Sequence, residues 1–164
     1  MQTPRMTGAM SVEQAQAVFE LLDRNGVRCW VMGGWGVDAL LGRMTREHKD
    51  LDLLVLLTDL SRYADIVQQH GFERKLEWGE SQPIEVAGLH FDSAFVDAHP
   101  DGQEIDVHVI DVDPQGVVTQ FHTDPWPLLG PVDRDGLDDG SLLDWCGGHR
   151  GLAVPVKWDN LAQA

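Results

Sequence analysis

The hydrophobic pattern predicts an amphipathic helix near the start of the chain. Ser11 and Gln14 stand three residues apart and form the sequence pattern of a capping box. Apolar residues then recur at the spacing of one helical face, at Ala15, Val18, Phe19 and Leu22. The pair Asn25-Gly26 is a typical helix stop, so we expect the helix to end there.

A strand, a glycine turn and a second helix are expected in close succession after it. Residues 27–32 are mostly β-branched, aromatic or otherwise apolar and predict a short strand. Gly33-Gly34 closes this strand with a tight turn, and a brief helix over residues 35–41 ends at Gly42. Residues 51–57 are apolar almost throughout, which predicts a strand buried on both faces near the centre of a sheet.

The middle of the chain is expected to be rich in strands. An amphipathic helix over residues 60–67, ending at His70-Gly71, precedes them. Strand-like segments follow at residues 72–78, 90–96, 104–112 and 117–122. Turn signals at Asp101-Gly102 and at residues 114–116 join these segments into an antiparallel meander, so we expect a mixed sheet.

Residues 123–164 break the periodicity with prolines and a run of acidic side chains, which predicts an irregular covering segment. Regular structure is expected there only near residues 154–156 and in the last eight residues. The chain has 164 residues, 43% of them hydrophobic and 24% charged, which is typical of one folded domain. We therefore expect a single α+β (α/β) domain over residues 1–164, in which helices flank a mixed central sheet and residues 1–10 are flexible.

Composition also bears on the compartment. The longest apolar run has five residues, whereas a membrane-spanning helix needs about 20, so no membrane segment is expected. The first ten residues lack the apolar core of a signal peptide. Cys29 and Cys146 are too few for a disulfide or zinc framework, and a reducing cytoplasm is the simplest location.

The charge balance excludes several partners. The 27 acidic and 12 basic residues give a net charge of −15 and a pI near 4.5. Nucleic acids and anionic membranes attract clustered Lys and Arg, so neither is expected as a partner. An anionic substrate would have to bring counter-charge, most simply a metal ion.

Three acidic residues on two expected strands are candidates for binding that metal. Asp50 and Asp52 open the apolar strand two residues apart, so the pleat directs both side chains to one face. On a later strand, Glu104, Asp106 and His108 share a face by the same alternation. Three carboxylates that meet across the sheet could hold two Mg²⁺ ions for phosphoryl or nucleotidyl transfer. The alternative is that the first two acids are simply solvated at a strand edge.

These residues resemble the nucleotidyltransferase superfamily, in its small branch of lincosamide and aminoglycoside nucleotidyltransferases. The resemblance rests on a glycine pair, a short helix, an acid-x-acid strand and a third acid on a later strand. It is carried here by Gly33-Gly34-Trp35-Gly36-Val37-Asp38, Arg46-x-His48-x-Asp50-x-Asp52 and Asp106-Val107-His108. It implies a polymerase β-like nucleotidyltransferase fold, and relative to the family the segment 123–164 is shortened.

The resemblance implies that AMP passes from ATP to a hydroxyl of a small antibiotic-like acceptor, with release of pyrophosphate. Asp50 and Asp52 would bind Mg²⁺ on the triphosphate. Asp106 would complete the second metal site or take the proton of the acceptor hydroxyl. These three acids are thus both the catalytic and the metal-binding candidates.

The remaining candidates have more ordinary alternatives. Gly33 and Gly34 would cradle phosphates at a helix N-terminus, or would only make a turn. Arg46 and Lys49 would neutralise the triphosphate, although a solvated basic loop is nearly as well supported. His108 would touch the acceptor, or would only pack on the sheet. For three further residues we expect structural roles: a hydrogen-bonded His48, and Trp30 and Trp35 as core anchors.

A catalytically silent module of the same fold, binding nucleotide or a protein, is the competing function, and a metallohydrolase is disfavoured by the lack of a histidine cluster. Retention of all three acids disfavours silence. The surface acids predict a cationic acceptor, and an open cleft would allow a homodimer. The acceptor, the hydroxyl and the nucleotide preference are left open by the sequence.

Overall fold

The computed structural model describes residues 8–79, 81–112, 114 and 118–120. Within these residues the helices are α1 (Val12–Arg24), α2 (Gly33–Leu41) and α3 (Leu60–Gln69), and a 3₁₀ turn, η1 (Leu57–Asp59), precedes α3. No helix in this part of the chain is long and apolar enough to cross a membrane.

Eight strands are present in the described residues, and six of them form one sheet. Their bounds are β1 (Cys29–Met32), β2 (Leu51–Leu56), β3 (Glu73–Glu77), β4 (Pro83–Val86), β5 (Leu89–Asp92), β6 (Ala94–Ala98), β7 (Glu104–Val112) and β8 (Val118–Gln120). The main sheet has the order β1-β2-β7-β6-β3, with β8 added to β7, and β4 and β5 form a separate hairpin. The pair β2-β7 is parallel and the other pairs are antiparallel, which confirms the predicted mixed sheet and α+β class.

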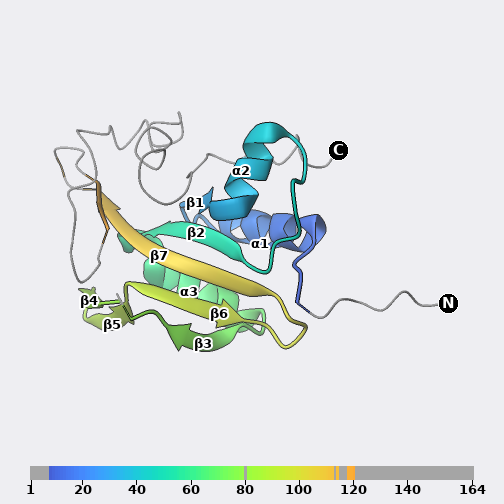
Figure 1. Cartoon of the computed structure of the whole chain (residues 1–164). Helices are drawn as coiled ribbons and strands as arrows, with labels where there is room; N and C mark the ends of the chain where they lie inside the picture. Colours follow the sequence, from blue (N-terminus) through green and yellow to red (C-terminus); the bar gives the residue numbers. More distant parts are fainter. Residues whose placement is uncertain (1–7, 80, 113, 115–117, 121–164) are drawn as a thin grey trace.

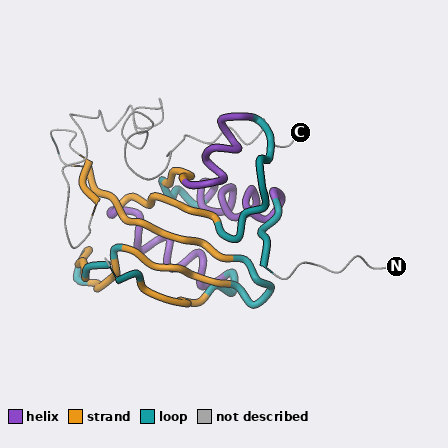
Figure 2. The backbone as a smooth tube through the Cα atoms, in the orientation of Figure 1, coloured by secondary structure: helices purple, strands orange, loops and turns teal. Residues whose placement is uncertain are grey.

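One face of the main sheet carries the hydrophobic core. Helices α1 and α3 pack there, and Figures 1 and 2 show both on the same side of the sheet, with α2 near the β1-β2 edge. The core joins these helices to alternate residues of the central strands: Leu51, Leu53, Val55, Ile105, Val107 and Val109. Because side chains alternate along a strand, Asp52 and Asp106 are directed to the opposite face.

Helix ends follow the predicted signals. The capping box is present, since the Gln14 backbone N–H donates to Ser11 Oγ at 3.1 Å and the Ser11 N–H donates to Gln14 Oε1 at 2.9 Å. Asn25 caps the C-terminus of α1. Gly42 ends α2 with a φ of 68°, a left-handed conformation that glycine adopts at little cost.

Several predicted bounds were wrong. The segment 90–96 is not one strand, because Ser93 separates β5 from β6, and the hairpin partner β4 was missed. There is no separate glycine turn after β1, since α2 begins directly at Gly33. The strand β2 is interior and buried, as predicted, between β1 and the middle strand β7.

Both chain ends were also the subject of predictions. Met10, expected in a flexible N-terminus, is 3% exposed, and its N–H donates to the carbonyl oxygen of His48 at 2.7 Å. The predicted irregular segment 123–164 and most of the predicted turn at 114–116 lie outside the described residues.

Candidate active site

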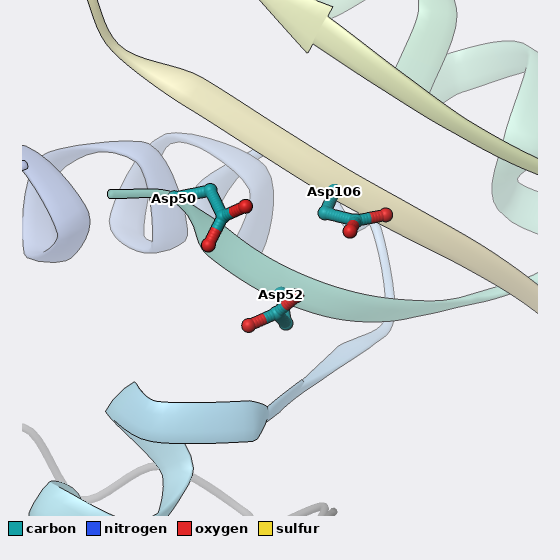
Figure 3. A group of neighbouring side chains, drawn as sticks. All are labelled: Asp50, Asp52 and Asp106. Carbon is teal, nitrogen blue, oxygen red and sulfur yellow. The ribbon is translucent and has the colours of Figure 1, made fainter. Parts of the chain in front are cut away.

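Strand register brings three carboxylates together. Asp50 directly precedes β2, Asp52 is its second residue, and Asp52 stands opposite Asp106 in the parallel pairing of β2 with β7. Each residue offers a carboxylate oxygen, and these oxygens all lie within 4.8 Å of one another. Figure 3 shows the three side chains on adjoining parts of the two strands. We call Asp50, Asp52 and Asp106 the acidic triad.

The chain enforces this arrangement through the residues between the acids. Leu51 and Leu53 flank Asp52, and Ile105 and Val107 flank Asp106; all four apolar side chains are fully buried in the core. A one-residue slip of either strand would bury a carboxylate in that core and expose the apolar residues. The core on one face therefore fixes the acids on the other.

Burial and repulsion within the triad both disfavour its charged form. Burial, together with the neighbouring Asp50 and Asp106, raises the pKa of Asp52 to about 8, while Arg46 opposes them. Burial, Asp106 and Glu104 also raise the pKa of Asp50 above its ordinary value. Close carboxylates in a partly buried site are stabilised by a cation between them, and hard oxygen donors suit Mg²⁺. The donor set of the triad thus fits a divalent metal.

The N-terminus of α2 lies against this cluster. Met32 stands opposite Asp52 in the β1-β2 pairing, so the next residue, Gly33, begins the helix beside that carboxylate. Gly33 has a φ of 64°, and a Cβ built there would overlap Asp52 Oδ2. Only glycine allows the backbone so close to the acid, and the first N–H groups of a helix bind anions.

Gly34 is equally constrained by its surroundings. A Cβ built there would overlap the His48 ring and approach the Arg46 guanidinium at 2.9 Å. Arg46 also acts electrostatically on Asp52. The glycine pair, Arg46 and the triad are therefore neighbours, as the proposed phosphate-binding role requires.

His48 is hydrogen-bonded and buried, as its expected structural role implies. Its Nε2 lies 2.5 Å from Asp38 Oδ2, and its ring centroid lies 4.6 Å from that of Trp35. Asp38 also accepts from the N–H of Thr45 at 3.1 Å and from its hydroxyl at 2.6 Å. Burial raises the pKa of Asp38, but these hydrogen bonds outweigh that effect and hold the pKa below its ordinary value.

Asp38 thus ties the loop after α2 to the helix itself, a role that was not predicted although the residue stands in the quoted glycine motif. The same loop carries Arg46 and Asp50 into the site. Trp35 and Trp30, expected as core anchors, are 0% and 2% exposed.

The other basic candidate, Lys49, pairs with an acid outside the triad. Its Nζ lies 3.4 Å from Glu104 Oε2, and the other oxygen of Glu104 accepts from Lys75. Lys49 still lowers the pKa of Asp50. Lys49 therefore lies at the edge of the triad, paired with Glu104.

Two ring nitrogens lie near one carboxylate oxygen of Asp106. His108 follows it by two residues on β7, and its Nε2 lies 3.4 Å from Asp106 Oδ1. Trp78, which directly follows β3, donates from its indole Nε1 to the same oxygen at 2.8 Å. Trp78 was not among the predicted site residues, because no pattern in the sequence relates it to a residue 28 positions away.

Comparison with known proteins assigns the chain to a family. The model of the aminoglycoside-2''-adenylyltransferase family matches residues 14–135. A lincosamide resistance protein from Staphylococcus haemolyticus is 26% identical over 117 residues, which are 71% of each chain. A 2''-aminoglycoside nucleotidyltransferase from Klebsiella pneumoniae is 40% identical over 47 residues, which are 27% of each chain.

Solved structures show the same fold. The lincomycin-bound lincosamide antibiotic adenylyltransferase LnuA matches with a TM-score of 0.61 at 19% identity, over 94% of this chain and 85% of that chain. ANT(2'')-Ia in complex with adenylyl-2''-tobramycin matches with a TM-score of 0.53 at 18% identity, over 92% and 71%. Because the family model covers most of its length, the chain belongs to the aminoglycoside-2''-adenylyltransferase family and is a nucleotidyltransferase.

Proposed function

We propose that this nucleotidyltransferase moves AMP from ATP to a hydroxyl of a small cationic antibiotic, a lincosamide or an aminoglycoside, and releases pyrophosphate. The observation that carries the proposal is the acidic triad, whose oxygens lie within 4.8 Å of one another beside the glycine N-terminus of α2. The lincosamide resistance protein aligns over a larger share of this chain than the aminoglycoside enzyme does, so lincosamides are the first acceptors to test.

The nucleotide would bind at the start of α2. Backbone N–H groups of Gly33 and Gly34 would donate to phosphate oxygens, and Arg46 would add positive charge beside Asp52. Asp50, Asp52 and Asp106 would hold Mg²⁺, which when bound supplies counter-charge to the triphosphate. This charge is needed because the chain itself is strongly acidic, at −15.

The transfer step would run at Asp106. The acceptor hydroxyl attacks the α-phosphorus of ATP, its proton passes to a carboxylate oxygen of Asp106, and the bond from the α-phosphorus to pyrophosphate breaks. Oδ1 of Asp106 already accepts from Trp78, so Oδ2 is the oxygen for this proton. His108, 3.4 Å from Oδ1 of Asp106, would contact the acceptor.

The proposal predicts a product that is heavier than the acceptor by one AMP unit. We would incubate the protein with ATP and Mg²⁺ against panels of lincosamides and aminoglycosides and analyse the acceptors by mass spectrometry. Asp50→Asn and Asp106→Asn are expected to lower turnover by about 10²-fold or more, because each keeps the shape of the side chain and removes its charge. Asp101→Asn, in the exposed turn between β6 and β7, is the matched control and should keep wild-type turnover.

Two outcomes would contradict the proposal. No adduct on any acceptor, combined with ATP binding that is independent of Mg²⁺, would favour the catalytically silent module. Full turnover by Asp106→Asn would reject the assignment of Asp106.

A further inference from the structure

Trp78, which directly follows β3, donates a hydrogen bond to Asp106 on β7. We propose that Trp78 is a positioning residue for Asp106, holding its carboxylate in the orientation used for metal binding and transfer. The proposal rests on the proposed function of the triad, and its contact is the 2.8 Å hydrogen bond from the indole Nε1–H to Oδ1.

The sheet explains how the indole reaches this far. Trp78 continues β3, whose Glu77 stands opposite Phe95 of β6, and the Trp78 N–H donates to the Ala94 carbonyl at 3.1 Å. Ala94 in turn stands opposite His108 of β7. Trp78 and Asp106 therefore lie on one face with β6 between them.

The segment that carries Trp78 is itself held in place. The Ser81 N–H donates to the Trp78 carbonyl at 3.0 Å, and Ser81 Oγ accepts from the N–H groups of Ser93 and Ala94, both at 3.1 Å. These bonds join the turn after β3 to the start of β6. An anchored backbone limits the rotamers of the indole, so the hydrogen bond to Asp106 costs little further ordering.

The contact has a specific consequence for the carboxylate. The Trp78 Nε1 and the His108 Nε2, the latter at 3.4 Å, both lie near the same oxygen, Oδ1. A hydrogen bond to a charged group is among the stronger ones, and it fixes the plane of the carboxylate. Oδ2 then remains for the roles proposed for Asp106, and partners that orient metal ligands in this way govern affinity and rate.

Trp78→Phe is the direct test, because it removes the donor and keeps most of the aromatic bulk. Trp78 is 38% exposed, so the variant leaves the core intact. Trp78→Ala, which also removes the bulk, shows how much of any effect belongs to packing. The matched carboxylate variants are Asp106→Asn, which alters the acceptor of the hydrogen bond, and Asp101→Asn, which does not.

The first measurement is the indole N–H resonance of the ¹⁵N-labelled protein, without nucleotide or acceptor. The peak that is lost in Trp78→Phe is that of Trp78. It should shift in Asp106→Asn and stay in place in Asp101→Asn. A peak that does not respond to Asp106→Asn would overturn the proposal.

The second measurement separates positioning from simple folding. Trp78→Phe is expected to weaken Mn²⁺ binding, followed by electron paramagnetic resonance of the free ion, about tenfold. At saturating Mg²⁺ it should lower kcat about tenfold and leave KM for ATP within about twofold. Wild-type Mn²⁺ affinity and kcat in Trp78→Phe would overturn the proposal. If the wild-type protein transferred no nucleotide, the proposed function would fail, and the resonance and Mn²⁺ affinity would still decide the role of Trp78.

Discussion

The charge of Asp52 destabilises the metal-free fold but favours the binding of a metal ion. The side chain lies among other acids, and burial with that repulsion raises its pKa to about 8. Without a cation the folded chain holds a proton there that the unfolded chain has already released at neutral pH. A cation removes the repulsion, so the same carboxylate that weakens the metal-free fold becomes a ligand.

The pH dependence of stability follows from the sign of this shift. The folded state binds more protons than the unfolded state between 3.8, the ordinary pKa of an aspartate, and the folded value of about 8, so stability should fall as pH rises through this window. Asp52→Asn should remove much of that decline. We therefore expect the melting temperature of the metal-free variant to exceed that of the wild type by several degrees at pH 8, and by less at pH 5.

The control for this prediction is the metal itself. Mg²⁺ should raise the melting temperature of the wild type and of Asp101→Asn, and it should have little effect on Asp52→Asn. A wild-type melting temperature that is constant from pH 5 to pH 8 in the presence of a chelator would contradict the assignment of a repelled, partly buried carboxylate.

The sequence correctly predicted which side chains share a face when both residues lie on the same strand or directly beside it. Asp50 with Asp52, and Asp106 with His108, are two apart and share a face as alternation requires. It failed for Trp78, because the contact with Asp106 depends on the order of strands in the sheet. It also failed for Asp38, whose partner His48 is fixed by the path of a loop.

At the scale of elements, the sequence predicted β7 with its observed bounds and missed the hairpin of β4 and β5. Apolar and polar residues alternate over Glu104–Val112, so the period was clear. The hairpin turn is Ala87-Gly88, between the paired residues Val86 and Leu89, with φ values of 52° and 79°. Turns with two positive φ values usually carry Asn-Gly or Asp-Gly, so the alanine concealed the signal.

This turn predicts a stabilising substitution. Ala87 occupies a left-handed conformation that costs an alanine about 1 kcal/mol and that asparagine tolerates better. Ala87→Asn should slow amide hydrogen exchange in β4 and β5 about two- to fivefold. Ala87→Val, with a β-branched side chain at the same position, should accelerate it. Equal exchange rates in both variants would show that the turn does not limit the opening of the hairpin.

At the scale of the whole molecule, the fold and the family agree with the interpretation of the sequence, and the charge gains a more specific meaning. Three of the 27 acidic residues form the triad. All 27 together, against 12 basic residues, give the chain a net charge of −15, which repels free nucleotide and attracts cations. What encloses the acceptor could not be predicted, because it depends on tertiary contacts that no local pattern in the sequence encodes.

The remaining charge predicts an acceptor preference that salt should reveal. Surface electrostatics steer a cationic acceptor toward an acidic protein, and salt screens this attraction over a Debye length of about 10 Å at 0.1 M. Raising NaCl from about 20 mM to about 300 mM should lower kcat/KM for a polycationic aminoglycoside about three- to tenfold, with kcat little changed. An N-acetylated form of the same acceptor, which carries fewer positive charges, is the matched control and should lose less. An equal loss of kcat/KM for both acceptors would show that salt acts on the binding of the nucleotide and its metal. It would contradict a role of the surface acids in recognising the acceptor.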